Sequence, residues 1–338
     1  MESIKKFYII LFFVTCLSFS QNNEYFNLID QAEIAIVNSD FKEANSLYQK
    51  AFNTNTEPFV LDIMNYLKCN CLLSDKIQKN AIITLLQKGL SIKELRKDVV
   101  LKKCIKKNDV EFKDVEPIYD SLYRKQIQQL GYDDQFYRLK KGSYVKYRKE
   151  IDSIDYNNIN TFIELVDEKG FPSEAKIGVE NRVGWQEWMI VVLHYQQQRS
   201  KDKSKPDITK ILKKAVDENK LRPSIYAHLA EMQNDSIYRK YYHSPLVMIE
   251  KGEYRIFKST LDKVNTIDEE REKIGMSSLK NQLVKFFFTQ SKKNKYDFNF
   301  GYVDTYSTHL TKQSKELKEY FRGKSVKVNN KNYDFIGK

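Results

Sequence analysis

Apolar side chains recur every three to four positions along most of this 338-residue chain, which is the spacing of amphipathic helices. Residues 159–166 follow this pattern closely, and Gly170 and Pro172 after them are typical of a helix end. Residues 208–216 carry a second apolar stripe, and Pro223 begins a further helical pattern. The pattern therefore predicts a mainly α fold.

Two short segments depart from the helical spacing. Residues 246–249 and 253–257 stand on either side of a turn at Gly252, which predicts a β-hairpin. The alternating segment 326–335 predicts a second small hairpin. The expected fold is a mostly helical domain with one or two small β-hairpins.

The N-terminus has the pattern of a secretory signal peptide over residues 1–20. Two lysines precede an apolar run over residues 7–17, and small residues stand at Ser18 and Ser20. The run is too short for a spanning helix, so we expect export to the periplasm or the medium, with cleavage after Ser20. Lipidation of Cys16 is a less favoured alternative, because the residues before it are a poor approach to a lipidated cysteine. No other segment is long and apolar enough to cross a bilayer.

The composition is that of a folded, basic protein. Hydrophobic residues make up 41% and charged residues 30%, and the formal net charge is +12. This charge favours anionic partners such as lipid headgroups, acidic polysaccharide or nucleic acid. The abundance of lysine, asparagine, isoleucine and tyrosine also fits an AT-rich genome, so generic basicity is favoured over a dedicated anion-binding face.

The cysteines and histidines do not form a metal-binding pattern. Cys69, Cys71 and Cys104 remain after signal cleavage, and an odd number argues against a complete disulfide framework. A bridge from Cys104 to one of the other two is left open. The C-N-C spacing is not a zinc pattern, and no two histidines stand at ligand spacing. Nucleotide-binding and serine-nucleophile motifs are also missing. We therefore expect no metal and no cofactor.

The segment after the signal peptide is expected to form paired helices. Small and large residues at Ala32, Ala44, Tyr48 and Ala51 resemble one tetratricopeptide repeat. Such units bury their apolar faces only by stacking on a neighbour. Residues 21–115 are therefore expected to be a tetratricopeptide-like helical segment, with a helical brace favoured over a peptide-binding groove.

An ordered series of short motifs follows over residues 120–277. The motifs are D-Q-x-x-R at Asp134, Gln135 and Arg138, G-F-P at Gly170, Phe171 and Pro172, a histidine at His194, Y-A-x-L at Tyr226, Ala227 and Leu229, and R-x-x-I-G at Arg271, Ile274 and Gly275. This order resembles an uncharacterised bacterial domain family often found behind signal peptides and helical repeats. The resemblance implies a helical domain of unknown function over 116–277, followed by a basic, aromatic-rich appendage over 278–338.

Two departures from the family pattern bear on activity. Leu193 stands where the family has a glutamine, and Met232 where it has an arginine. If the family is enzymatic, these losses of polar groups indicate an inactive member.

The central question of chemistry is the role of His194, which closes the apolar run 188–193. We favour a core histidine whose ring nitrogens bond a carbonyl or a carboxylate. The alternative is a general base oriented by Asp134 or Glu231, with Arg138 or Arg271 holding an anionic substrate.

The aromatic residues have structural and functional interpretations as well. Trp185 and Trp188 are candidate lining residues of a ligand groove, although anchors between helices are favoured. The tyrosines and phenylalanines among the basic residues 301–338 are expected to form a structural cap rather than to stack on sugars or bases.

The leading functional hypothesis is an exported, non-catalytic envelope or secreted protein-interaction module. Its expected partner is another protein, with an acidic envelope polysaccharide as the second choice and nucleic acid not expected. The alternative is a hydrolase-like enzyme that uses His194 as acid/base.

Overall fold

The computed structural model describes residues 24–74, 76–107, 115–202, 204–232, 247–250, 253–301, 307–309, 319 and 322–328. The predicted signal peptide, its cleavage site and Cys16 lie outside these residues. The chain divides into two compact units. The helical unit contains the described residues of 58–216 and 220–237, and the sheet-containing unit those of 24–57, 217–219 and 238–338.

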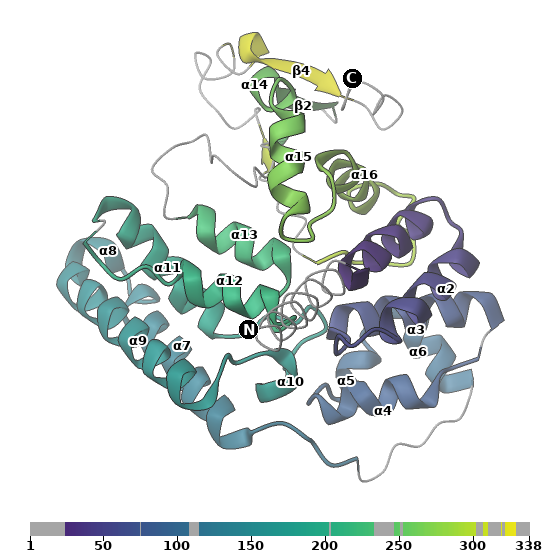
Figure 1. Cartoon of the computed structure of the whole chain (residues 1–338), viewed down its shortest axis with the longest axis horizontal. Coiled ribbons are helices and arrows are strands. Elements are labelled where there is room, and N and C mark those ends of the chain that lie inside the picture. The colour runs from purple at the N-terminus through teal and green to yellow at the C-terminus, as the bar shows by residue number, and fades with distance from the viewer. Residues whose placement is uncertain are drawn as a thin grey trace, which may run out of the picture. The chain divides into compact units, whose positions relative to one another are not determined.

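The fold is mainly α, which confirms the prediction from the apolar spacing (Figure 1). Among the described residues, no helix combines the length and the apolar character that crossing a bilayer requires. The helices of the helical unit are α3 (Val60–Ser74), α4 (Lys79–Gln87), α5 (Ile92–Leu95), α6 (Val99–Lys107), α7 (Ser121–Arg138), α8 (Ser143–Lys146), α9 (Arg148–Lys169), α10 (Glu174–Ile177), α11 (Trp188–Lys201), α12 (Thr209–Asp217) and α13 (Pro223–Glu231).

Helices α7, α9 and α11 pack against one another and position the candidate site. The predicted end of α9 is confirmed, because Gly170 adopts a φ of 82° at its C-cap. Gly131 allows the close approach of α7 to the start of α11, since a Cβ there would lie 2.6 Å from Cβ of Glu187. Any larger residue at position 131 would push these two helices apart.

A disulfide joins Cys71 of α3 to Cys104 of α6, so one of the two bridges left open by the sequence is present. Cys69 is free and buried. Burial raises the pKa of its thiol to about 12, so Cys69 stays protonated and serves as a small apolar side chain. A buried ion pair between Lys68 of α3 and Asp98, which directly precedes α6, also joins these two parts of the chain at 2.6 Å.

The sheet-containing unit combines helices with a four-stranded sheet of order β3-β1-β2-β4. Its elements are a helix over 24–37, α2 (Phe41–Phe52), β1 (Val247–Glu250), β2 (Glu253–Phe257), α14 (Lys258–Leu261), α15 (Val264–Glu272), α16 (Leu279–Thr289), β3 (Ser307–His309) and β4 (Ser325–Val328). A turn separates the first two helices: Ser39 has a φ of 64°, and the Asp40 carboxylate accepts a hydrogen bond from the Glu43 amide.

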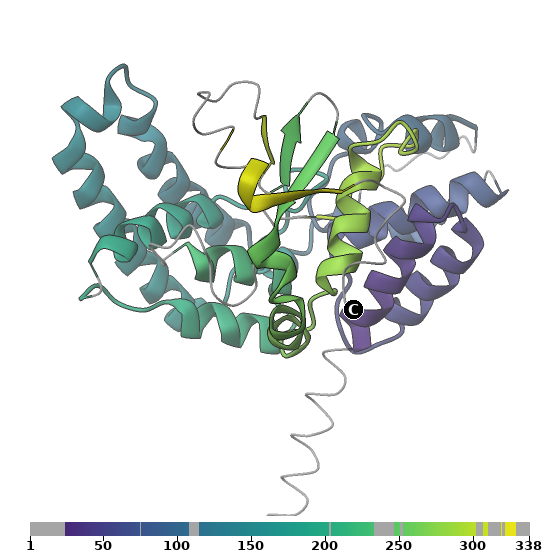
Figure 2. The ribbon, with the colours of Figure 1, turned by 90° about the horizontal axis from the view of Figure 1, so that it is seen from above.

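The predicted hairpin is confirmed, because β1 and β2 pair in antiparallel register from Val247–Ile256 to Glu250–Glu253. Figure 2 shows these two green strands with the yellow strand β4 beside them. The expected second hairpin is different: β4 pairs with β2 rather than with a neighbour in sequence. Residues 329–335 of that segment lie outside the described residues.

The core of the sheet-containing unit is built from distant parts of the chain. Leu283, Phe286 and Phe287 of α16 pack against Val247 and Ile256 of the hairpin. The structure thus places α16 within this core rather than in a separate appendage after residue 277. The reason is chemical, since α16 presents a largely apolar face that the sheet covers.

Candidate functional site

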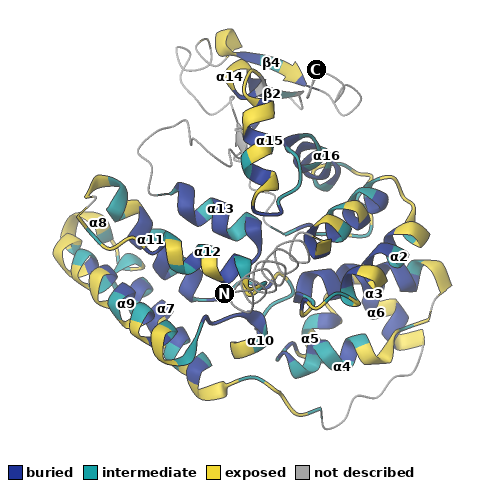
Figure 3. Ribbon diagram, in the orientation of Figure 1, coloured by how far each residue is buried: buried dark blue, intermediate teal, exposed yellow. Residues whose placement is uncertain are grey.

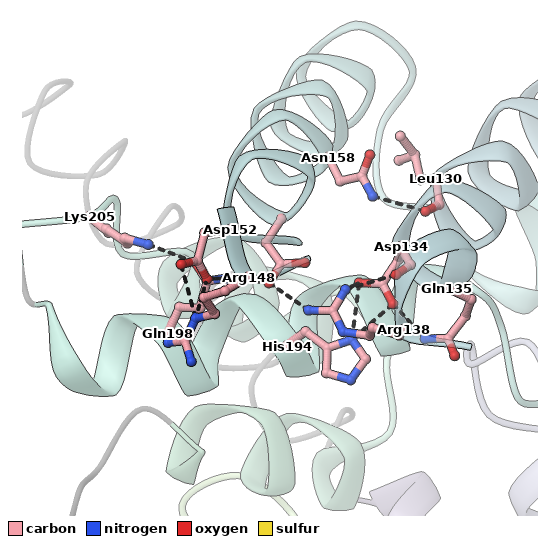
Figure 4. Close-up of polar contacts among 11 residues, drawn as sticks. Leu130, Asp134, Gln135, Arg138, Arg148, Asp152, Asn158, His194, Gln198 and Lys205 are labelled. Carbon is pink, nitrogen blue, oxygen red and sulfur yellow. Dashed lines mark hydrogen bonds and ion pairs between the residues drawn. The ribbon is translucent and has the colours of Figure 1, made fainter. Parts of the chain in front are cut away.

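His194 of α11 and Asp134 of α7 form a hydrogen-bonded pair (Figure 4). Nδ1 of His194 lies 2.9 Å from Oδ2 and 3.0 Å from Oδ1 of Asp134. The Asp134 side chain is fully buried, while that of His194 retains 14% exposure. The D-Q-x-x-R motif and the histidine of the apolar run are therefore brought together, which is compatible with both interpretations of His194.

Arg138 ties the same carboxylate to a second one. Its guanidinium donates to Oδ1 of Asp134 at 3.0 Å and to the Asp134 carbonyl at 2.8 Å. It also donates to Oδ2 of Asp155 on α9 at 2.6 Å. Gln135 adds a further hydrogen bond to Asp134 at 2.6 Å. One arginine therefore compensates two buried carboxylates that come from two helices.

Helix α11 closes the network from the other side. Gln198 donates to Asp155 and, at 3.1 Å, to Asp152. Its own side-chain oxygen accepts a hydrogen bond from Lys205 at 2.7 Å. Because Gln198 lies one turn after His194, α11 contributes two side chains to the network between α7 and α9. We call this network the polar seam; its members are Asp134, Arg138, Asp152, Asp155, His194 and Gln198.

Burial and charge oppose each other in this seam. Burial raises the pKa of Asp155 above its ordinary value, although the adjacent Arg138 lowers it. Burial disfavours the Arg138 cation, but the hydrogen bond to Asp155 and the charges of both aspartates raise its pKa overall. The guanidinium is therefore fixed as a cation, and its loss would leave the carboxylates without compensation.

The arrangement supports two functions in principle. A carboxylate that is hydrogen-bonded to Nδ1 holds an imidazole in one orientation and one tautomer. No described residue forms a hydrogen bond with Nε2 of His194. That is the geometry of an oriented general base. The seam also holds three helices together, as a core network would. It contains no serine, threonine or cysteine nucleophile among the residues that bond His194 and Asp134.

The other two predicted catalytic residues lie on other elements of the chain. Glu231 is buried at the end of α13 in the helical unit. Arg271 belongs to the sheet-containing unit, where it is buried and donates to the Ser277 carbonyl at 2.6 Å.

The tryptophans take different places. Trp188 is fully buried, stacks at 5.9 Å from Phe162, meets Phe171 edge-on at 5.0 Å and donates to Gln186 at 2.8 Å. This is the environment of a helix anchor, the favoured interpretation. Trp185 is partly exposed and accepts a hydrogen bond at its carbonyl from Asn181.

Sequence reasoning missed Asp155 and Gln198. The available signal was a carboxylate on the apolar face of a helix, because Asp155 stands one turn after Ile151 and one turn before Ile159, and all three are buried. A buried carboxylate on such a face requires a cationic or donor partner. Nothing in the local sequence identifies that partner as Arg138.

A further buried carboxylate, that of Glu174, is held at the start of α3. Its Oε2 accepts a hydrogen bond from the Val60 amide at 2.7 Å, one of the donors that α3 leaves unpaired at its N-terminus. Gly184 leaves room for this side chain, since a Cβ there would lie 2.2 Å from Oε1. Burial raises the pKa of Glu174 to about 7, although the Val60 amide, Arg222 and Lys88 lower it.

We expect Glu174→Gln to remove a pH dependence of folding. A raised pKa means that the folded chain retains a proton that the unfolded chain releases, so this contribution is complete below pH about 4.5 and is lost as the pH rises to about 7. The span corresponds to about 3 kcal/mol. Urea unfolding from pH 4 to 8 should show a flatter profile for Glu174→Gln than for wild type and for exposed Glu164→Gln. Parallel profiles would contradict the prediction.

The third feature of the helical unit is an exposed surface that we call the α7–α9 tip, residues 139–149. It contains the turn at Gly142, where φ is 74°, and α8, and none of its residues is buried. Leu139, Tyr144 and Val145 are 80%, 58% and 89% exposed. Figure 3 shows exposed residues on α8 and on the adjoining end of α9.

The tip is also strongly basic. It holds five basic residues and no acidic one: Lys140, Lys141, Lys146, Arg148 and Lys149. Arg148 pairs with Asp152 at 3.1 Å, whereas the four lysines form no ion pair with any described residue. The surface thus combines apolar side chains with uncompensated positive charge.

Among the described residues, no three histidine, cysteine or carboxylate side chains are grouped to hold a metal ion. Comparisons with protein-family models, with curated proteins and with solved structures yield no match to this chain.

Proposed function

We propose that this protein is an exported, non-catalytic interaction module that contacts its partner through the α7–α9 tip. The observation that carries the proposal is the exposure of Leu139 and Val145 next to unpaired lysines. Isolated exposed apolar residues are ordinary, but a cluster of them rimmed by polar residues is typical of an interaction site.

Export is supported by the N-terminal pattern and by the disulfide. A bridge between Cys71 and Cys104 persists in oxidising compartments and is rare in the cytosol. The absence of catalysis is supported by the seam below the tip. Arg138 is hydrogen-bonded to both Asp134 and Asp155, and it ends α7 directly before Leu139. The candidate catalytic residues then serve to fix the tip on α9 and α11.

The test is a site-specific photocrosslink from the tip. A benzoylphenylalanine at position 145 in producing cells should give an adduct that weakens when Leu139→Ser is added. The same probe at Val99, which is 57% exposed on α6, is the matched control. Equal adducts from positions 145 and 99, or none from 145, would overturn the proposal. The identity of the adduct also tests the protein or polysaccharide partner predicted from the sequence.

A second candidate function is acid/base catalysis by His194, because Asp134 orients its ring and leaves Nε2 without a described partner. It predicts a hydrolytic activity that is lost in His194→Ala and Asp134→Asn but kept in tip variants. An activity that is unchanged in His194→Ala would exclude it.

A further inference from the structure

We infer that the partner of the α7–α9 tip is the surface of an anionic lipid bilayer. This inference rests on the proposed function, because it names the partner class of the same surface. It is carried by three observations: the apolar residues of the tip, the aromatic rings in and beside the tip, and the lysines of the tip.

The apolar residues project instead of lining a groove. Leu139 and Val145 stand on either side of the Gly142 turn and keep 80% and 89% of their surface exposed. A groove would cover a larger part of each side chain. A projecting apolar surface is buried most readily by a deformable partner into which it can insert. The boundary between the headgroups and the acyl chains of a bilayer is such a partner.

The rings near the turn form a cluster suited to that boundary. Nζ of Lys140 lies 3.9 Å from the ring centroid of Phe136, 4.3 Å from Tyr137 and 5.4 Å from Tyr147. Aromatic residues with a polar edge, and lysines whose stems lie on apolar surface, are favoured at the membrane–water interface. Phe136 is itself 58% exposed on the last turn of α7.

The charges supply the preference for anionic lipid. Lys141, Lys146 and Lys149 are exposed and unpaired beside the apolar residues, and the tip has no acidic residue to repel a headgroup. Each lysine near an anionic surface strengthens binding by about fivefold. An acidic polysaccharide would satisfy the lysines, but its hydrated chain gives Leu139 and Val145 nothing in which to bury.

The experiment is co-sedimentation of the purified protein with vesicles. Vesicles of phosphatidylcholine with roughly 30% phosphatidylglycerol should bind it, vesicles of phosphatidylcholine alone should bind it weakly, and salt should reduce the binding. Leu139→Ser/Val145→Ser and Lys141→Glu/Lys146→Glu should each lower the partition coefficient by about tenfold or more.

The controls separate the tip from general basicity. Lys102→Glu/Lys103→Glu on α6 changes the net charge by the same amount at exposed positions, and Val99→Ser/Val183→Ser removes the same class of side chain elsewhere. Both should bind within about twofold of wild type if the tip is the docking site. Equal losses in tip and control variants would assign the binding to overall charge and overturn the inference.

A depth measurement distinguishes insertion from adsorption. Val145→Trp should gain quenching by brominated lipid beyond that of the wild-type tryptophans. No vesicle binding, or binding without this quenching, overturns the inference. If position 145 still crosslinks to a protein, or to a second copy of this chain, the proposed function stands while the lipid assignment fails. If position 145 gives no adduct of any kind, both the proposed function and the lipid assignment fail.

Discussion

Arg138→Met should lower the free energy of unfolding of the helical unit by about 3 to 5 kcal/mol. The substitution keeps the length and apolar stem of the side chain but removes the cation between Asp134 and Asp155. Those side chains are 0% and 1% exposed, so neither can regain water in the folded state. Both tryptophans lie in the helical unit, so urea unfolding followed by tryptophan fluorescence reports on this unit.

The loss of stability in Arg138→Met should depend on pH, and its direction follows from burial of the carboxylates. Without Arg138, burial favours the protonated form of Asp155, and the folded chain holds a proton that the unfolded chain releases. The loss of stability should therefore be smaller at pH 5 than at pH 8. Asp134→Asn/Arg138→Met/Asp155→Asn, which removes all three charges, should recover most of the stability.

His194→Ala is the comparison that separates the two roles of the seam. Asp134 would keep its bonds to Arg138 and Gln135, so we expect a loss of only about 1 to 2 kcal/mol. A loss as large as that of Arg138→Met would make His194 the centre of the network. A gain in stability would favour the acid/base function over the structural one. A loss below about 1 kcal/mol for Arg138→Met would show that the carboxylates are solvated.

The sequence predicted the members of the site better than their partners. Asp134 and Arg138 are one helical turn apart, so their contact follows from helix geometry alone. His194 stood out because it ends an apolar run. Its bond to Asp134 spans 60 residues and was one of two alternatives, since Glu231 fitted the same role. Asp155 was missed because its partner is set by the packing of α7 on α9.

The same limit applies to the fold. Local spacing was sufficient to predict the helices and the hairpin β1–β2. It did not reveal that β4 would pair with β2, or that the first helix would share a unit with α16. Those contacts join residues about 70 and 250 positions apart, and no periodicity within a window of one helix carries that information.

Lys285→Met tests this long-range grouping directly. The ammonium of Lys285 on α16 lies 2.5 Å from Asp30 and 2.6 Å from Glu33, both on the helix 24–37. Burial disfavours the cation, but Glu33 and Asp30 outweigh it and raise the pKa of Lys285. Removing it leaves two carboxylates one turn apart in a poorly hydrated contact, which should lower the free energy of unfolding by about 3 to 5 kcal/mol.

The effect should be confined to one unit. Hydrogen exchange measured by mass spectrometry should speed up in peptides from residues 24–52 and 279–289, while peptides from α7 and α11 keep their protection. The matched rescue is Asp30→Asn/Glu33→Gln/Lys285→Met, which removes all three charges and should restore most of the protection. Faster exchange limited to residues 279–289 would contradict the grouping, because the first helix would then be stable without its contact to α16.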